Sequence, residues 1–171
     1  MNGTAPRRGG KERALARQHW LVKSEPEAFS IEDLERAPAH TTSWEGVRNY
    51  QARNFLREME PGDGVLFYHS NASPTGVAGA AEVARAAYPD PTALDRRSPY
   101  FDPKATRADP RWSVVDLTWR ATFREVISLD RLRQVPALAR MILLRKGNRL
   151  SVMPVTPAEW KAVLGLAGSK G

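Results

Sequence analysis

The chain has 171 residues, no cysteine and a formal net charge of +7. This length fits one domain with its own hydrophobic core, and the lack of cysteine excludes disulfides, zinc–thiolate sites, iron–sulfur clusters and thiol nucleophiles. No run approaches the roughly 20 apolar residues that a membrane helix needs, and the N-terminus lacks the apolar core of a secretory signal. We therefore expect an intracellular monomer without a membrane partner, cytoplasmic in a bacterium and nuclear in a eukaryote.

The charge is distributed unevenly along the chain. Residues 1–18 carry five Lys/Arg against one Asp/Glu, residues 19–95 carry six against twelve, and residues 96–171 carry fifteen against six. A basic second half favours contact with phosphates, although an ordinary solvated surface explains the charge equally well. Because residues 1–18 mix glycine, proline and charge without apolar periodicity, we predict a disordered basic tail there, an ordered domain over 19–168 and a flexible end at 169–171.

Short strands and short helices alternate along the predicted domain. Helix signals include the capping-box pair Ser30 and Asp33, and the clearest strand signal is the alternation of apolar and polar residues over 114–123. Strands are predicted over residues 20–23, 65–69, 76–88, 114–123 and 150–152. Helices are predicted over residues 30–36, 48–59 and 156–167. The strands are too close in sequence for a regular βαβ series, which predicts an α+β fold with a strongly curved or barrel-like mixed sheet flanked by short helices.

Motifs of catalysis are missing from the sequence. The three histidines lack metal-ligand spacing, and there is no nucleophile elbow, phosphate loop or dinucleotide loop. Glu25, Glu45 and Asp63 could form a pair of carboxylates, but nothing in the sequence pairs them, which favours structural or surface roles. We expect no enzyme activity, no metal and no cofactor.

Polar and aromatic residues gather instead at the ends of the predicted elements, where binding residues usually lie. Aromatic rings that could stack on a planar heterocycle belong to Trp44, Tyr50 and Tyr68. Groups that could bond its edge or a phosphate belong to Ser24, Asn49, Asn54, Ser70, Arg53 and Arg149. For each residue taken alone, a core aromatic or a helix-capping asparagine is the more frequent role. Apolar periodicity assigns three further aromatics to the core: Trp112, Trp119 and Trp160.

Several sequence blocks together resemble the signature of the EVE domain family, in order and at the expected spacing. They are residues 20–26, 44–54, 62–63, 67–70, 88–90, 111–112 and 149–152. The resemblance covers about residues 19–167, and the coincidence of many blocks makes it more specific than any single motif. One departure is residues 146–148, which stand where the family usually has another arginine or glycine pairing. The basic tail lies outside the resemblance.

The resemblance implies a PUA-like fold, related to YTH domains, and recognition of modified cytosine in DNA by taking the base into a pocket. It also implies a set of pocket residues: Lys23, Ser24, Glu25, Trp44, Asn49, Tyr50, Arg53, Asn54, Tyr68, His69, Ser70, Arg149 and Ser151. Our leading hypothesis is a non-catalytic reader of a modified base in DNA or RNA, with the basic second half on the backbone. Two alternatives stay open: an enzyme on a nucleotide-like molecule, with Glu25 as base and His69 as its partner, or a sensor of a free nucleoside.

Overall fold

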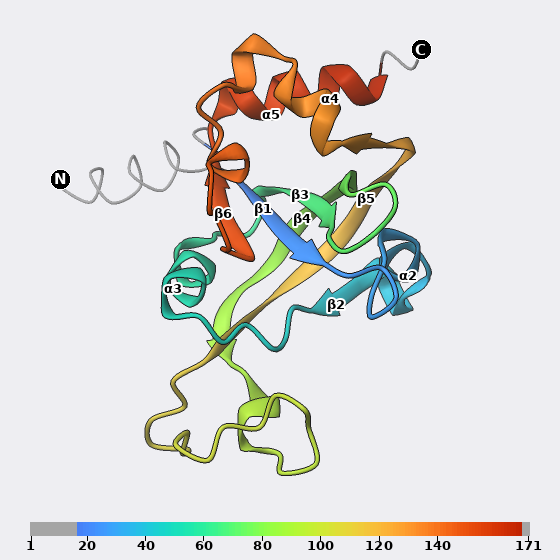
Figure 1. Ribbon diagram of the computed structural model, residues 1–171. Helices are drawn as coiled ribbons and strands as arrows, with labels where there is room; N and C mark the ends of the chain where they lie inside the picture. Colours follow the sequence, from blue (N-terminus) through green and yellow to red (C-terminus); the bar gives the residue numbers. More distant parts are fainter. Residues whose placement is uncertain (1–16, 169–171) are drawn as a thin grey trace, which may run out of the picture.

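A computed structural model of the chain describes residues 17–168 and contains one mixed six-stranded sheet (Figure 1). In space the strands follow the order β2-β5-β4-β3-β1-β6, and only β1 and β3 pair in parallel. The strands are β1 (His19–Ser24), β2 (Thr41–Ser43), β3 (Gly64–His69), β4 (Gly76–Pro89), β5 (Ser113–Ser128) and β6 (Val152–Val155). This arrangement confirms the α+β class, but β2 and β6 are edge strands, so the sheet is open and not a closed barrel.

In the described part of the chain, four α-helices flank the sheet: α2 (Ile31–Arg36), α3 (Tyr50–Glu58), α4 (Leu129–Arg133) and α5 (Pro157–Gly168). Helix α2 begins at the predicted capping box, in which the Ser30 side chain accepts from the Asp33 N–H and Asp33 accepts from the Ser30 N–H. Helix α3 begins two residues later than predicted, because Asn49 keeps an extended backbone and caps the helix. Strand β2 and helix α4 were not predicted. Within residues 17–168, no helix is long and apolar enough to cross a membrane.

Two apolar layers lie on opposite faces of the sheet, because successive strand residues point to opposite sides. In β1, Trp20 and Val22 join the layer under α2 and α3, whereas Leu21 joins the layer under α4 and α5. Figure 1 shows α4 and α5 together at one end of the molecule. Trp119 and Trp160, which we predicted as core residues, are only partly buried against these layers.

Two residues of the predicted tail lie within the described part of the chain. Arg17 and Gln18, the last residues of the predicted tail, contact the domain: the Arg17 guanidinium lies 5.4 Å from the Trp160 ring centroid, and Gln18 accepts from the Gly64 N–H. The rest of the predicted tail and the predicted flexible end lie outside the described residues.

Residues 90–112, which we call the β4–β5 excursion, leave the sheet and form a separate lobe (Figure 1). Its small apolar centre contains only Ala93, Ala105 and Trp112, so Trp112 is buried as predicted but outside both main layers. The Trp112 indole N–H donates to the Asp102 carboxylate over 2.6 Å. With so few apolar contacts, the lobe depends on polar contacts for its shape.

Candidate functional site

A cavity of about 730 Å³ opens where the end of β1, the loop between β2 and α3, and the β4–β5 excursion meet. Its walls come from residues 23–25, 28–29, 42–49, Tyr100 and Ser151. Both apolar rings and hydrogen-bonding groups line it, as is common for sites that bind small molecules or single bases.

Trp44 forms a rigid part of the cavity wall. Its side chain is only 6% exposed, and its ring makes edge contacts with Phe29 at 6.3 Å and with Phe67 at 5.4 Å between centroids. These contacts place it in the apolar layer under α2 and α3. Trp44 is therefore a core aromatic and a lining residue at once, which combines the two roles that the sequence left open.

Ser24 and Asn49 offer complementary hydrogen-bonding groups at the cavity. The Ser24 hydroxyl donates to the Phe29 carbonyl over 2.7 Å, so it is left with acceptor capacity. The Asn49 side-chain oxygen accepts from the Ala52 N–H over 2.9 Å as the cap of α3. Because this bond occupies the oxygen, Asn49 presents its NH₂ group as a donor, and that group has no partner within residues 17–168.

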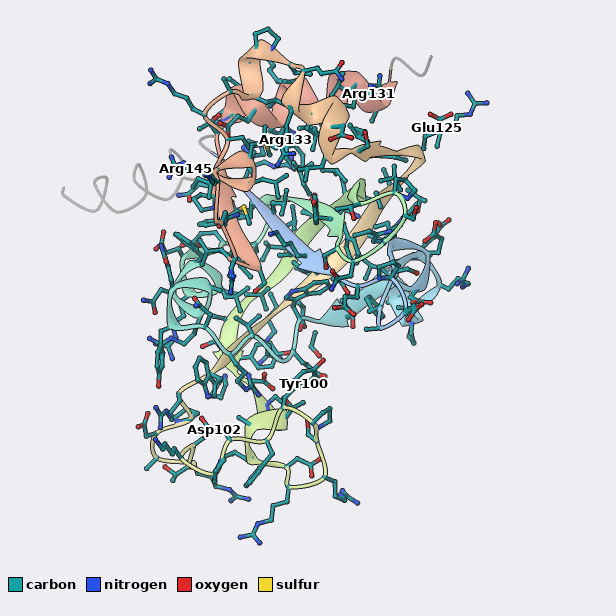
Figure 2. All side chains as sticks on the ribbon, viewed as in Figure 1. Tyr100, Asp102, Glu125, Arg131, Arg133 and Arg145 are labelled. Atoms are coloured by element: carbon teal, nitrogen blue, oxygen red, sulfur yellow. The ribbon has the colours of Figure 1, made fainter. Side chains whose placement is uncertain are left out.

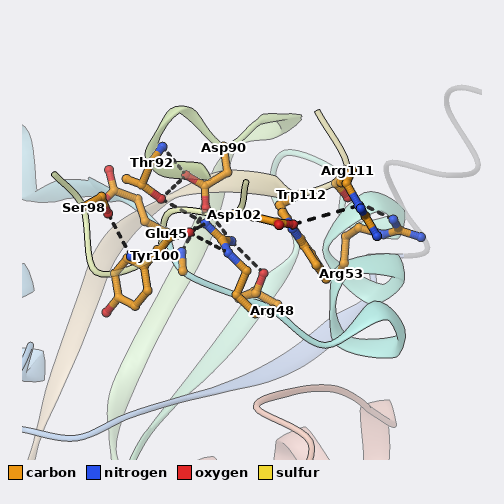
Figure 3. A network of polar contacts seen from close by, with 12 residues as sticks. Glu45, Arg48, Arg53, Asp90, Thr92, Ser98, Tyr100, Asp102, Arg111 and Trp112 are labelled. Carbon is orange, nitrogen blue, oxygen red and sulfur yellow. Dashed lines mark hydrogen bonds and ion pairs between the residues drawn. The ribbon is translucent and has the colours of Figure 1, made fainter. Parts of the chain in front are cut away.

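A buried carboxylate holds the excursion against the cavity rim (Figure 3). Asp90 accepts from the Gly46 N–H and the Arg48 guanidinium, both at 3.0 Å, and from the Thr92 N–H at 2.8 Å. Burial alone would raise the pKa of Asp90, but these hydrogen bonds outweigh it and hold the pKa below its ordinary value. Arg48 in turn donates to the Tyr100 carbonyl over 2.7 and 3.0 Å.

Tyr100 is a lining aromatic that the sequence did not reveal. Its ring is 41% exposed and lies over Gly46, where a Cβ atom would come within 2.7 Å of it. Gly46 also has a φ of +85°, a conformation that favours glycine. Tyr100 lies in a loop without apolar periodicity, so no local pattern marks it, and only the distant contacts of Arg48 place it at the cavity.

A second group of sequence-predicted residues lies outside the cavity, between α3 and the excursion. Tyr50 stacks on Trp112 with centroids 4.7 Å apart and planes 19° apart, and the Arg53 guanidinium lies 4.7 Å from the Tyr50 centroid. Asn54 accepts from Arg53 over 2.8 Å, and Arg111 donates to the Tyr50 hydroxyl. These residues hold α3 against the excursion.

The third group follows β3. Tyr68 belongs to the layer under α4 and α5, on the sheet face opposite Trp44, so one base cannot stack on both rings. His69 is buried, and its Nε2 accepts from the Ile31 N–H over 3.1 Å. Burial lowers the pKa of His69, which favours the neutral ring that this bond requires. The suggested pairing of Glu25 with His69 as catalytic groups is therefore not formed at the cavity.

The structure thus divides the thirteen sequence-predicted residues. Six line the cavity: Lys23, Ser24, Glu25, Trp44, Asn49 and Ser151. Seven do not: Tyr50, Arg53, Asn54, Tyr68, His69, Ser70 and Arg149. Among residues 17–168 there is no group of three or more His, Cys, Asp or Glu side chains that could hold a metal ion.

Comparison with known proteins extends these observations. Human thymocyte nuclear protein 1 is 41% identical over 165 residues, which cover 86% of this chain and 73% of the human protein. A crystal structure from Pseudomonas putida is 52% identical with a TM-score of 0.84, covering 87% of this chain and 99% of that one. A structure of human THYN1 in complex with DNA containing 5-methylcytosine is 40% identical with a TM-score of 0.85. The match covers 90% of this chain and 99% of that one. The EVE domain model matches residues 18–166, and the chain belongs to the EVE domain family.

Proposed function

We propose that this protein is a non-catalytic nucleic-acid-binding module that takes a modified base, 5-methylcytosine in DNA, into the cavity beside Trp44. The observation that carries the proposal is the cavity, on a fold shared at a TM-score of 0.85 with a relative solved on DNA containing 5-methylcytosine. A base enters such a cavity after flipping out of the stack, which costs a few kcal/mol. Favourable interactions within the cavity must offset this cost.

Apolar contact would recognise the methyl group. Phe29, Trp44 and Val47 line the cavity, and the edge contacts of Trp44 with its neighbours keep its ring in one place. A wall that is already ordered loses little side-chain entropy when a ligand binds. The exposed ring of Tyr100 is available at the rim for stacking on the base.

Hydrogen bonds would recognise the cytosine edge, which has O2 and N3 as acceptors and the N4 amino group as donor. The Asn49 NH₂ group supplies a donor for O2 or N3. The Ser24 hydroxyl, which already donates to Phe29, and the exposed Glu25 carboxylate supply acceptors for N4. Because Asn49 is oriented by its bond to the Ala52 N–H, its donor is fixed before the base arrives.

The geometry also favours binding without turnover. His69 is committed to the Ile31 N–H, and Glu25 accepts from the Asn71 amide over 2.7 Å. Neither arrangement places a general base beside a nucleophile that it could activate. Hydrolysis or group transfer on a nucleotide requires such a pair. Incubation of a methylated oligonucleotide with pure protein should leave the oligonucleotide unchanged by mass spectrometry.

Substitution of Asn49 by serine tests the proposal. Serine keeps an N-cap acceptor for α3 but removes the NH₂ donor, so we expect the fold to persist and the affinity for 5-methylcytosine DNA to fall about tenfold. The measurement is fluorescence anisotropy with two duplexes that differ only in one cytosine methyl group. Asn54→Ser is the matched control, because Asn54 is exposed on the same helix and outside the cavity. Equal affinities of the Asn49→Ser and Asn54→Ser variants for the methylated duplex would show that the base binds outside this cavity.

A further inference from the structure

Seven basic side chains project from residues 124–149, which we call the helical cap. The cap contains the end of β5, helix α4 and two short 3₁₀ helices. Its basic residues are all exposed: Arg124, Arg131, Arg133, Arg140, Arg145, Lys146 and Arg149. Figure 2 labels Arg131, Arg133 and Arg145 on the part of the molecule that carries α4. None of the seven side chains forms an ion pair or a hydrogen bond with another residue of the range 17–168.

Buried apolar anchors hold the cap on the sheet and turn its charges outward. Leu132, Leu138, Met141 and Leu143 are buried in the layer on that face of the sheet. Two of the basic residues, Arg133 and Arg140, lie between these anchors in sequence, the other five flank them, and all seven are exposed. The cap has seven Lys/Arg and two Asp/Glu, whereas residues 19–123 and 150–171 together have fourteen and sixteen. The cap therefore has a net charge of +5, whereas these other ranges together have a net charge of −2.

The cap borders the cavity through Lys23 and Tyr68. Lys23 lines the cavity, and its Nζ lies 5.6 Å from the Tyr68 ring centroid. Tyr68 and Leu132, the residue before Arg133, pack in the same apolar layer. Burial raises the pKa of Tyr68, and the nearby charge of Arg133 opposes that rise. At the other end of the cap, Arg149 is two residues from Ser151, whose carbonyl accepts from the Lys23 N–H over 2.9 Å.

Lys23 is a cation without a carboxylate partner among the described residues. Burial lowers its pKa, so an anion beside it would recover part of the lost solvation. The cap also lacks large exposed apolar groups: in the described chain these are Tyr50, Leu94 and Tyr100. Charge without exposed apolar anchors suits a polyanion better than a membrane surface.

We propose that Lys23, Arg133, Arg145 and Arg149 form a phosphate-binding surface that holds the DNA backbone on one side of the base in the cavity. This inference rests on the proposed function and adds the direction in which the strand leaves the cavity. The backbone passes Lys23 as it leaves the cavity and continues over the exposed surface of the cap toward α4. The excursion, on the other side of the cavity, contributes the rim and not the main backbone contacts.

The test compares two triple variants with the same change in net charge. The cap variant is Arg133→Gln, Arg145→Gln and Arg149→Gln, and the control is Arg96→Gln, Arg97→Gln and Arg107→Gln on exposed positions of the excursion. Binding to a short duplex with one 5-methylcytosine is measured over a series of salt concentrations. We expect the slope of log affinity against log salt to become shallower in the cap variant by about 0.9 for each phosphate that the replaced arginines neutralise, and to change little in the control.

Further measurements make each outcome decisive. A cap variant with lysine at the three positions should recover the slope of the original protein, since lysine keeps the charge. Equal slopes for the cap variant and the control would overturn the proposed surface. Absence of any preference for the methylated duplex in the original protein would instead overturn the proposed function, and the comparison of slopes would still decide the path of the backbone. Thermal melting of each variant confirms that it is folded.

Discussion

The β4–β5 excursion and the helical cap both carry many charges but use them differently. In the excursion Asp90 pairs with Arg48 at 3.0 Å, and Asp102 accepts from Trp112 and lies 4.0 Å from Arg111. In the cap, no basic side chain has such a partner within the described chain. The excursion therefore uses Asp90, Asp102 and Arg111 to hold its own shape, and the cap leaves its charges for a partner.

The difference follows from how each region is anchored. The excursion buries only two alanines and Trp112, too little apolar surface to order more than twenty residues by itself. The cap has four buried apolar anchors in a main layer, so its shape does not depend on its charges. In this domain, a basic segment whose anchors are apolar is the better candidate for binding phosphate than one whose charges are paired internally.

The largest expected effect is that of removing the carboxylate that holds the excursion. Asp90→Ala leaves the Gly46 N–H unpaired and the Arg48 charge without its partner, and breaking a buried ion pair in this way costs about 3–5 kcal/mol. Urea denaturation measures this decrease in the free energy of unfolding. The matched change in the cap, Arg145→Ala, should alter it by no more than about 0.5 kcal/mol. Similar decreases in the free energy of unfolding of Asp90→Ala and Arg145→Ala would show that the charges of the cap hold its shape as those of the excursion do.

Two glycines with left-handed backbone conformations, Gly46 at the cavity and Gly147 in the cap, allow a second comparison of the two regions. Gly46 has a φ of +85° and faces the Tyr100 ring, whereas Gly147 in the cap has a φ of +78° and no atom within 4 Å of a Cβ built on it. Alanine at either position should cost about 1–2 kcal/mol in backbone strain. Gly46→Ala should cost more, because the ring must move, and it should also weaken binding of DNA. The difference between the two variants in thermal melting and anisotropy isolates the contact with Tyr100.

Acid should affect the excursion through Asp90. Its pKa in the folded protein lies below the ordinary value of 3.8, so the folded state binds fewer protons than the unfolded state in this range. The stability that Asp90 contributes is thus present above about pH 3.8 and is lost as the pH falls through the folded pKa. Denaturation from about pH 6 to about pH 3 should show a steeper fall in stability in the original protein than in Asp90→Asn. Parallel curves would show that Asp90 does not contribute to this fall.

Local patterns in the sequence predicted the elements that depend on local physics. Alternation over 114–123 revealed β5, and the Ser30 capping box revealed α2. The excursion has no such pattern, because its shape comes from contacts such as Asp90 with Gly46, 44 residues apart. For the same reason Tyr100 was missed at the cavity, although the neighbouring loop with Trp44 was found.

Tyr68 lies outside the cavity for a reason that the sequence contained. Phe67 and Tyr68 are neighbours in one strand, so their side chains must point to opposite faces of the sheet. Because Phe67 packs against Trp44, the Tyr68 ring lies on the other face of the sheet from Trp44. Residue type at the end of a strand therefore predicts a shared cavity less well than residue type taken together with the face of the sheet that each residue occupies.

The smallest expected effect concerns the cap in the absence of DNA. Its seven cations repel one another without nearby pairing, so the original protein should become slightly more stable as salt screens the repulsion. The triple variant Arg133→Gln, Arg145→Gln, Arg149→Gln should keep the free energy of unfolding within about 0.5 kcal/mol per site and respond less to salt. Thermal melting over a series of salt concentrations measures both the stability of the triple variant and its response to salt. A decrease of more than about 1 kcal/mol per site would mean that these arginines hold the fold, as the charges of the excursion do, and are not free to bind phosphate.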